Sequence, residues 1–267
     1  MEKQIYNNNL RINYKIEGKG NAVVLVHGFL ETSETWKDFA KLLSQNCKVI
    51  TVDLPGHGRS ELHEEPETMC KYAESIYYIL NEENITETII VGHSMGGYVA
   101  LAFAENYPFM LSGLCLFHSS PFADDEIKKQ IRLNTIQQTE EGNKNIICSE
   151  HAKAVYADDN IEKFKAEIKE GKRIALSVSE EGIIASLLTM RERKDRNNIL
   201  ENLQVPFLYI LGKKDRFIPE NVLNKMNMPK NYKIAVLENS GHMGMIEEKE
   251  KSLKLINDFC KNVYKPQ

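Results

Sequence analysis

Six short, continuous apolar runs, each bounded by glycine or polar residues, limit the folds that this chain can adopt. Runs of this kind are typical of strands buried on both faces of a parallel sheet, whereas half-solvated antiparallel strands alternate apolar and polar residues. The runs are AVVLVHG at 22–28, CKVITVD at 47–53, ETIIVG at 87–92, LSGLCLF at 111–117, VPFLYILG at 205–212 and YKIAVLE at 232–238. We therefore expect a parallel sheet whose inner strands come from these segments.

Helical patterns lie between several of the runs. One is TMCKYAESIYYILNEE from Thr68, and another is MGGYVALAFAENY from Met95, which stops before Pro108. Alternation of strand and helix predicts an α/β fold with right-handed crossovers. Before the first run, residues 3–18 have the pattern of a hairpin that turns at Asn7-Asn8-Asn9, which predicts an antiparallel edge of the sheet.

The interval 121–198 breaks this alternation, because it contains charged, helix-like patterns and no convincing buried-strand run. The simplest interpretation is an all-helical insertion between two strands of the sheet. It could be a solvated subdomain that only packs on the core, or a lid over a functional site, and composition leaves both open. The predicted division is a first part of the core at 1–120, a helical cap at 121–198 and a second part of the core at 199–267.

Composition excludes several classes of protein. The length of 267 residues is close to the size, roughly 250–300 residues, at which one hydrophobic core stops growing. The net charge of −4 comes without a long single-sign block, so we expect no nucleic-acid partner. Five cysteines without a C-x-x-C spacing suggest neither a disulfide framework nor a zinc site. The first residues contain no apolar signal-peptide core, and no segment is apolar enough to span a membrane, which predicts a soluble, cytoplasmic protein.

The stretch VGHSMGG, residues 91–97, places Ser94 between two glycines, directly after an apolar run and before a helical pattern. Ordinary turn chemistry would explain a serine among glycines. However, a residue between a parallel strand and the following helix lies at the carboxyl edge of the sheet, where ligands bind in open α/β folds. The G-x-S-x-G spacing in this context predicts a nucleophile elbow, in which Gly92 and Gly96 make a sharp turn sterically possible.

A serine hydroxyl needs a base, and the base needs an acid that orients it. Of the seven histidines, His242 lies late in the chain, in a loop that follows an apolar strand. Asp215 directly follows the preceding predicted strand. The order Ser94, Asp215, His242 is the order of the triad in α/β-hydrolases. Asp124, at the start of the helical interval, is the alternative acid.

The chain resembles small, capped serine hydrolases of the α/β-hydrolase superfamily in five motifs. These are VVLVHGFLET, VITVDLPGHGRS, IIVGHSMGG, LYILGKKDRFIP and NSGHMG. The resemblance implies a mostly parallel, eight-stranded sheet with helices on both faces and a helical cap inserted after strand six. It also implies an oxyanion hole made by the backbone N–H groups of Phe29 and Met95.

Side chains near these motifs and in the cap are candidates for contact with a substrate. The predicted substrate-binding residues are Phe29, Leu30, His118, Phe122, Leu187, Met190 and Met243. We expect His27 and His93 to be structural and His57 to shape a turn. The charged stretch TMRERKDR at 189–196 is either a solvated face or a site for an anionic substrate.

The residue types favour one reaction class and leave others open. Serine at position 94 argues against a resemblance to haloalkane dehalogenases and epoxide hydrolases, and HGF instead of HGGG argues against the hormone-sensitive-lipase branch. We expect a serine hydrolase that cleaves a small to medium carboxylic ester, lactone or thioester through an acyl-enzyme. The alternatives are a carbon–carbon bond hydrolase or a menaquinone-pathway-like lyase, a perhydrolase, and a ligand-binding signalling module with slow hydrolysis. No motif predicts a cofactor or metal, and the substrate's acid and alcohol and the oligomeric state stay open.

Overall fold

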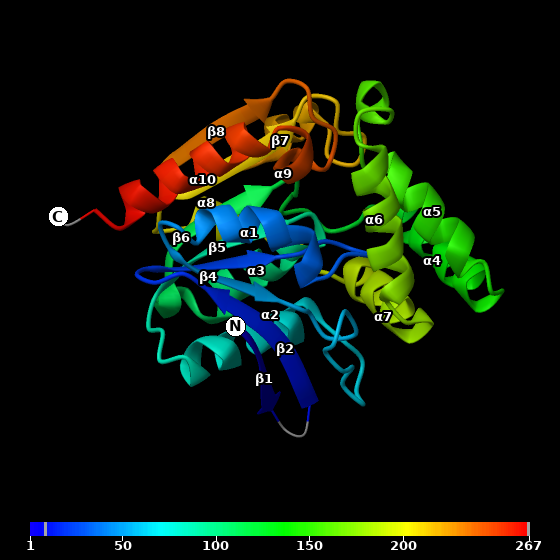
Figure 1. Cartoon of the computed structure of the whole chain (residues 1–267), viewed down its shortest axis with the longest axis horizontal. Coiled ribbons are helices and arrows are strands. Elements are labelled where there is room, and N and C mark those ends of the chain that lie inside the picture. The colour runs from blue at the N-terminus through cyan, green and yellow to red at the C-terminus, as the bar shows by residue number, and fades with distance from the viewer. Residues whose placement is uncertain (8–9, 266–267) are drawn as a thin grey trace.

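Eight strands form one sheet in the order β1-β2-β4-β3-β5-β6-β7-β8 in a computed structural model that describes residues 1–7 and 10–265 (Figure 1). The strands are β1 Glu2–Asn7, β2 Leu10–Glu17, β3 Ala22–Val26, β4 Lys48–Val52, β5 Thr88–His93, β6 Leu111–Phe117, β7 Phe207–Gly212 and β8 Tyr232–Leu237. Strands β3 to β8 are parallel, and β1 and β2 form an antiparallel edge. The six predicted strands and the edge hairpin are confirmed. Asn8 and Asn9, in the predicted turn, lie outside the described residues.

The inner strands β3 to β7 are buried, as the apolar runs predict, except for the half-buried Lys48 of β4 and Ser112 of β6. Every residue of β3, β5 and β7 is buried. The prediction of burial on both faces is wrong for β8, where Tyr232 is 50% exposed and Ile234 is 37% exposed. The reason is that β8 lies at the end of the sheet and pairs only with β7. An apolar run does not indicate which strand becomes the edge.

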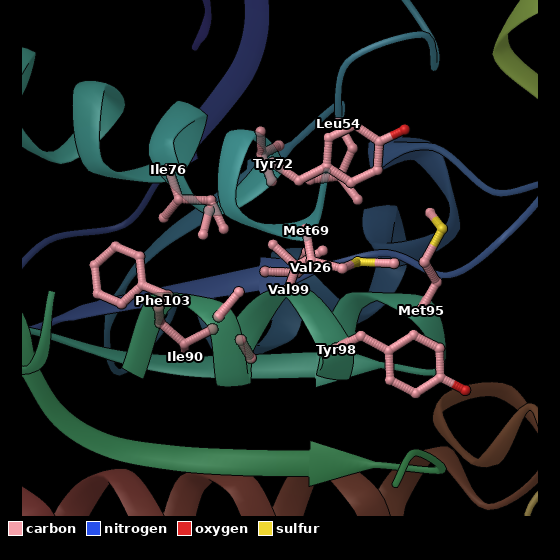
Figure 2. Close-up of a cluster of buried hydrophobic side chains, with 14 of the residues drawn as sticks. Val26, Leu54, Met69, Tyr72, Ile76, Ile90, Met95, Tyr98, Val99 and Phe103 are labelled. Atoms are coloured by element: carbon pink, nitrogen blue, oxygen red, sulfur yellow. The ribbon is translucent and has the colours of Figure 1, made fainter. Parts of the chain in front are cut away.

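Helices cover both faces of the sheet. Helices α1 (Lys37–Leu43) and α10 (Lys249–Val263) lie on one face, and α2 (Met69–Glu82) and α3 (Met95–Asn106) lie on the other (Figure 1). Figure 2 shows the second interface, where side chains of α2 and α3 pack together above the strands. The labelled side chains are Val26, Leu54, Met69, Tyr72, Ile76, Ile90, Met95, Tyr98, Val99 and Phe103. This packing fixes the N-terminus of α3, and with it Ser94, against the sheet.

Five α-helices and the short helix η3 connect β6 to β7, which agrees with the expected helical interval. The α-helices are α4 Glu126–Glu140, α5 Lys144–Ala154, α6 Lys165–Ser177, α7 Glu180–Arg191 and α8 Asn197–Glu201. The remaining short helices are η1 Ser33–Trp36, η2 Pro108–Met110, η3 Asp158–Asn160, η4 Glu220–Lys225 and α9 Gly244–Glu247. The division of the chain at 120 and 198 stays a prediction. None of the helices in the described part of the chain is both long and apolar enough to cross a membrane.

Helices α4 to α7 stand beyond the ends toward which the parallel strands point (Figure 1). Several hydrogen bonds attach the insertion to loops of the core, and two of them lie close to the predicted site residues. Ser186 of α7 places its Oγ 3.3 Å from His57 Nε2, and the carbonyl of Val155, directly after α5, accepts the His242 N–H at 2.8 Å. The insertion therefore packs against the edge of the sheet where Ser94 and His242 lie.

Candidate active site

Ser94 occupies a strained turn between β5 and α3. Its φ of 51° and ψ of −117° are dihedral angles that residues with a side chain rarely adopt. A Cβ atom on Gly92 would lie 2.3 Å from the carbonyl oxygen of Gly96, and one on Gly96 would lie 2.4 Å from that of Val26. Glycine is therefore required at both positions, as the elbow motif predicts. In the described first turn of α3, the Ser94 hydroxyl makes no capping hydrogen bond, so helix capping does not account for this serine.

Asp215 and His242 form a buried hydrogen-bonded pair. Asp215 Oδ2 lies 2.7 Å from His242 Nδ1, and Oδ1 accepts the N–H groups of Phe217 at 2.8 Å and Ile218 at 3.0 Å. Burial alone would raise the pKa of Asp215, but the charge of His242 and the hydrogen bonds from His118 and His242 hold it well below its usual range. Asp215 is therefore a carboxylate at neutral pH. It holds the His242 ring with Nδ1 toward the acid, which leaves Nε2 for another partner.

The elbow and the His242 loop are neighbours. The ring of His93, directly before Ser94, lies 5.0 Å from the ring of His242, and His93 Nε2 lies 2.9 Å from the His242 carbonyl oxygen. The ends of β5, β7 and β8 thus bring the three predicted triad residues to one edge of the sheet. The alternative acid Asp124 instead forms ion pairs with Arg132 and Arg193. These pairs occupy its carboxylate, which makes no hydrogen bond to a histidine among the described residues.

The structure encloses His118 next to the acid and does not expose it toward a pocket, contrary to what its position in the sequence led us to expect. Its side chain is fully buried, and its Nδ1 lies 3.0 Å from Asp215 Oδ2. Two imidazoles therefore share one carboxylate oxygen. Because Asp215 and the surrounding rings enclose His118, we correct its expected role in direct substrate contact.

The other predicted substrate-binding residues lie in two regions. Leu187 and Met190 of α7 are buried in the same hydrophobic cluster as Met95, and Phe122 packs against that cluster. Leu30 and Met243 line a cavity of about 650 Å³ whose wall includes parts of α1, α6 and α10. Roles of these side chains in binding stay predictions.

Glu31 is a site residue that the sequence analysis missed. Its carboxylate accepts the Gly28 N–H at 2.8 Å and lies 3.1 Å from His93 Nδ1. Burial would raise the pKa of Glu31, but His93 lowers it to about 2. Burial likewise opposes the positive charge of His93, yet Glu31 raises the pKa of that imidazole above its ordinary value. A buried ion pair thus ties the loop that carries Phe29 to the end of β5, directly before Ser94.

His151, on α5, is a second residue without a sequence signal. Its ring lies 5.6 Å from that of Phe29 and 5.9 Å from that of Phe217, and the Phe217 ring lies 5.1 Å from His242. Burial lowers the pKa of His151 to about 4, so this imidazole is neutral at pH 7. His151 of the helical insertion therefore adds an uncharged ring between Phe29 and Phe217 of the core, and Phe217 lies next to His242.

The remaining expectations concern histidines and a charged stretch. His27 is structural, as expected, because its Nε2 accepts the Leu54 N–H at 3.1 Å. His93 bonds within the core, and His57 packs its ring 4.9 Å from His27 in the turn after β4. In the stretch 189–196, Glu192, Lys194 and Asp195 are exposed, as in a solvated face. Arg193 and Arg196 are only 7% and 4% exposed and form ion pairs, so these two arginines are not free to bind an anionic substrate.

Among the described residues, one cluster contains three or more side chains of the kinds that bind metal ions. It consists of His118, Asp215 and His242. Hydrogen bonds within the group occupy the atoms that face one another. The group therefore acts as a hydrogen-bonded unit. The absence of a cofactor stays a prediction.

A mostly parallel, eight-stranded sheet with a strained serine between a central strand and its helix defines an α/β-hydrolase architecture. The chain belongs to this family, since the family's sequence model, described as alpha/beta hydrolase fold, matches residues 21–249. An uncharacterized protein of Mycobacterium tuberculosis is 35% identical over 112 residues, which are 42% of this chain and 33% of that protein. The match thus spans about a third of the length of that relative.

Two other similar proteins match along nearly their whole length. A pimeloyl-[acyl-carrier protein] methyl ester esterase of Vibrio cholerae is 27% identical over 92% of this chain and 97% of its own. The solved structure of a thermophilic esterase from Thermogutta terrifontis superposes with a TM-score of 0.93 at 26% identity, and covers 99% of both chains.

Proposed function

We propose that this protein is a serine hydrolase that cleaves a small to medium carboxylic ester, lactone or thioester through an acyl-enzyme on Ser94. The observation that carries the proposal is the strained Ser94 turn, held next to a His242 ring that a buried carboxylate orients. Strain of this kind is retained where a side chain must be presented at a fixed angle. Full-length similarity to two esterases supports the same reaction class.

In the proposed mechanism, His242 accepts the hydroxyl proton as Ser94 Oγ attacks the carbonyl carbon of the substrate. Asp215 stabilises the imidazolium that forms. The carbonyl oxygen becomes an oxyanion, which accepts hydrogen bonds from the backbone N–H groups of Phe29 and Met95. Each such donor lowers the barrier by about 3 kcal/mol. His242 then protonates the leaving alcohol or thiol, and water releases the acid by the reverse sequence of proton transfers.

The contacts around this site favour an uncharged substrate group. Phe29, Phe217 and the neutral His151 ring lie next to one another beside His242. The buried Arg193 is neutralised by Asp124, and its guanidinium lies 4.0 Å from the ring of Tyr98 in α3. Carboxylate recognition by this arginine would require loss of a buried ion pair, which is costly.

The direct test is covalent labelling of the folded protein with an organophosphonate, followed by peptide mass spectrometry. We expect one adduct, on the peptide that contains Ser94, and none on the Ser94→Ala variant. A panel of p-nitrophenyl esters of increasing chain length, lactones and carbon–carbon hydrolase substrates then identifies the reaction. Labelling at another residue would disprove the nucleophile assignment. Turnover far below about 1 per second on every substrate, with tight ligand binding, would favour a signalling module instead.

A further inference from the structure

Two histidines approach the same oxygen of Asp215 from different strand ends. His242 Nδ1 lies 2.7 Å from Oδ2, and His118 Nδ1 lies 3.0 Å from the same atom. The other oxygen, Oδ1, accepts two backbone N–H groups. The carboxylate therefore has four close nitrogen neighbours, of which only His242 belongs to the proposed triad.

The surroundings of His118 determine where its proton lies. Burial lowers the pKa of His118 to about 4, although Asp215 opposes this shift, so the ring carries one proton at neutral pH. If that proton were on Nε2, the Nδ1 lone pair would face the negative Oδ2 at 3.0 Å. The Gly212 N–H also approaches Nδ1, at 3.2 Å, but a carboxylate is the stronger partner because its hydrogen bonds are charge-assisted. His118 therefore donates Nδ1–H to Asp215.

This arrangement has costs that packing alone would not require. His118 has a φ of 51°, in the left-handed region that disfavours residues with a side chain. Its Nε2 is buried and has no hydrogen-bond partner among the described residues. A Cβ atom on Gly244 would lie 2.4 Å from this Nε2, so the start of α9 leaves room for the ring only because residue 244 is glycine. An apolar side chain would fill the same space without a bare buried nitrogen.

We propose that His118 is a positioning residue for the reaction, because its Nδ1–H fixes Asp215 Oδ2 in line with His242 Nδ1 and shares the charge of that oxygen. The proposal rests on the proposed function of Ser94, Asp215 and His242. It extends the hydrogen-bonded unit by one residue that touches neither the substrate nor the reacting atoms.

The shared oxygen has a consequence for the basicity of His242. A hydrogen bond from His118 withdraws negative charge from Oδ2, so Asp215 stabilises the His242 imidazolium less than a carboxylate with one partner would. Loss of the His118 donor should raise the pH at which His242 gains its proton. The same loss frees the carboxylate to rotate, which should lower the catalytic rate constant.

Other titratable groups surround the unit of His118, Asp215 and His242 and could also change its titration, so the test leaves them unchanged. They are His93 and Glu31 under the elbow, His151 of the insertion, Tyr209 of β7 and Glu247 of α9. His93 lies 6.1 Å from the His118 ring and 5.0 Å from the His242 ring. None of these residues is substituted, so a change in titration reports on His118.

Two substitutions of His118 by side chains of similar size separate the effect of its hydrogen bond from the effect of its packing. His118→Asn keeps an N–H donor near the position of Nδ1, and asparagine tolerates a positive φ. His118→Leu removes the donor and keeps the volume, and Leu30 shows that leucine occupies the same backbone region in this chain, with a φ of 58°. The variants are compared with wild type by the pH dependence of kcat and kcat/KM on the best p-nitrophenyl ester, and by an NMR titration of His242 in the free protein.

We expect His118→Asn to keep kcat within about threefold and to leave the acid limb of kcat/KM in place. His118→Leu should lower kcat by roughly tenfold at unchanged KM, the scale of one lost hydrogen bond to a charged group, and should raise the His242 midpoint by roughly half a pH unit or more. Wild-type kinetics and titration in the leucine variant would overturn the proposal, as would equal losses in both variants. If the wild-type protein cleaves no ester, the proposed function fails, and the NMR titration alone then decides whether His118 controls His242.

Discussion

Substitution of Glu31 by glutamine tests whether the buried ion pair beneath the elbow stabilises the fold. The change preserves the size of the side chain and an oxygen that can accept the Gly28 N–H. It removes the negative charge that faces His93 Nδ1 at 3.1 Å. Both side chains are at least 90% buried, so water cannot replace the lost partner.

The magnitude follows from the pKa of Glu31. A carboxyl group whose pKa falls from 4.5 to about 2 on folding contributes about 3 kcal/mol to the free energy of unfolding at neutral pH. Loss of one member of a buried ion pair typically costs a similar amount, about 3–5 kcal/mol. For a chain of this size, about 3 kcal/mol lowers the melting temperature by roughly 6–12 °C.

The pH dependence has a definite sign. The pKa of Glu31 is lowered on folding, so its contribution is complete above its unfolded pKa and is lost as the pH falls from about 5 toward 2. The pKa of His93 is raised, so its contribution is present below its unfolded pKa and is lost as the pH rises through the folded value. The melting-temperature difference between wild type and Glu31→Gln should therefore narrow between pH 5 and pH 3.

Differential scanning calorimetry at one scan rate and three pH values provides the measurement. Glu34→Gln is the matched control, because it makes the same chemical change three residues further on, in η1, at a side chain that is 46% exposed and pairs with Arg173. An exposed pair contributes only about 0–1 kcal/mol, so this control should melt close to wild type. A Glu31→Gln protein that melts within about 2 °C of wild type at pH 7 would refute the reasoning.

Two further predictions concern the acid and the elbow. Asp215→Asn should lower the kcat for the best ester by up to about 10⁴-fold with little change in KM. The Asp124→Asn protein should lose about 3 kcal/mol of stability, but its folded fraction should keep most of the wild-type turnover. Steady-state kinetics with the inverse pattern would move the acid to position 124. Gly96→Ala should destabilise the protein by at least about 1–3 kcal/mol, because its Cβ meets backbone oxygen at 2.4 Å. Gly171→Ala in α6, where the Cβ meets nothing within 4 Å, should instead stabilise the protein by about 0.5–1 kcal/mol. Urea unfolding that ranks the stabilities of these two variants in the opposite order would contradict the steric argument.

Features that depend on local sequence could be predicted without the structure. Burial of inner strands requires continuous apolar runs, and all six runs became strands of one sheet. The elbow is local as well, since Gly92 and Gly96 are needed within two residues of Ser94 for the backbone to turn. Asp215 and His242 were predicted as acid and base because each comes after a strand, and parallel strands end at a common edge. The structure brings the two side chains within hydrogen-bonding distance.

Features that depend on the order of strands could not be predicted from the chain alone. The sequence gives no sign that β8 is an edge strand, because burial depends on a neighbour that the pairing supplies or omits. His118 and Asp215 are 97 residues apart, and they meet only because β6 and β7 are adjacent in the sheet. Glu31 and His93, 62 residues apart, meet because β3 pairs with β5. Polar side chains have no periodic pattern that names their partners, so the tertiary structure alone decided which charged and hydrogen-bonding groups surround the proposed triad.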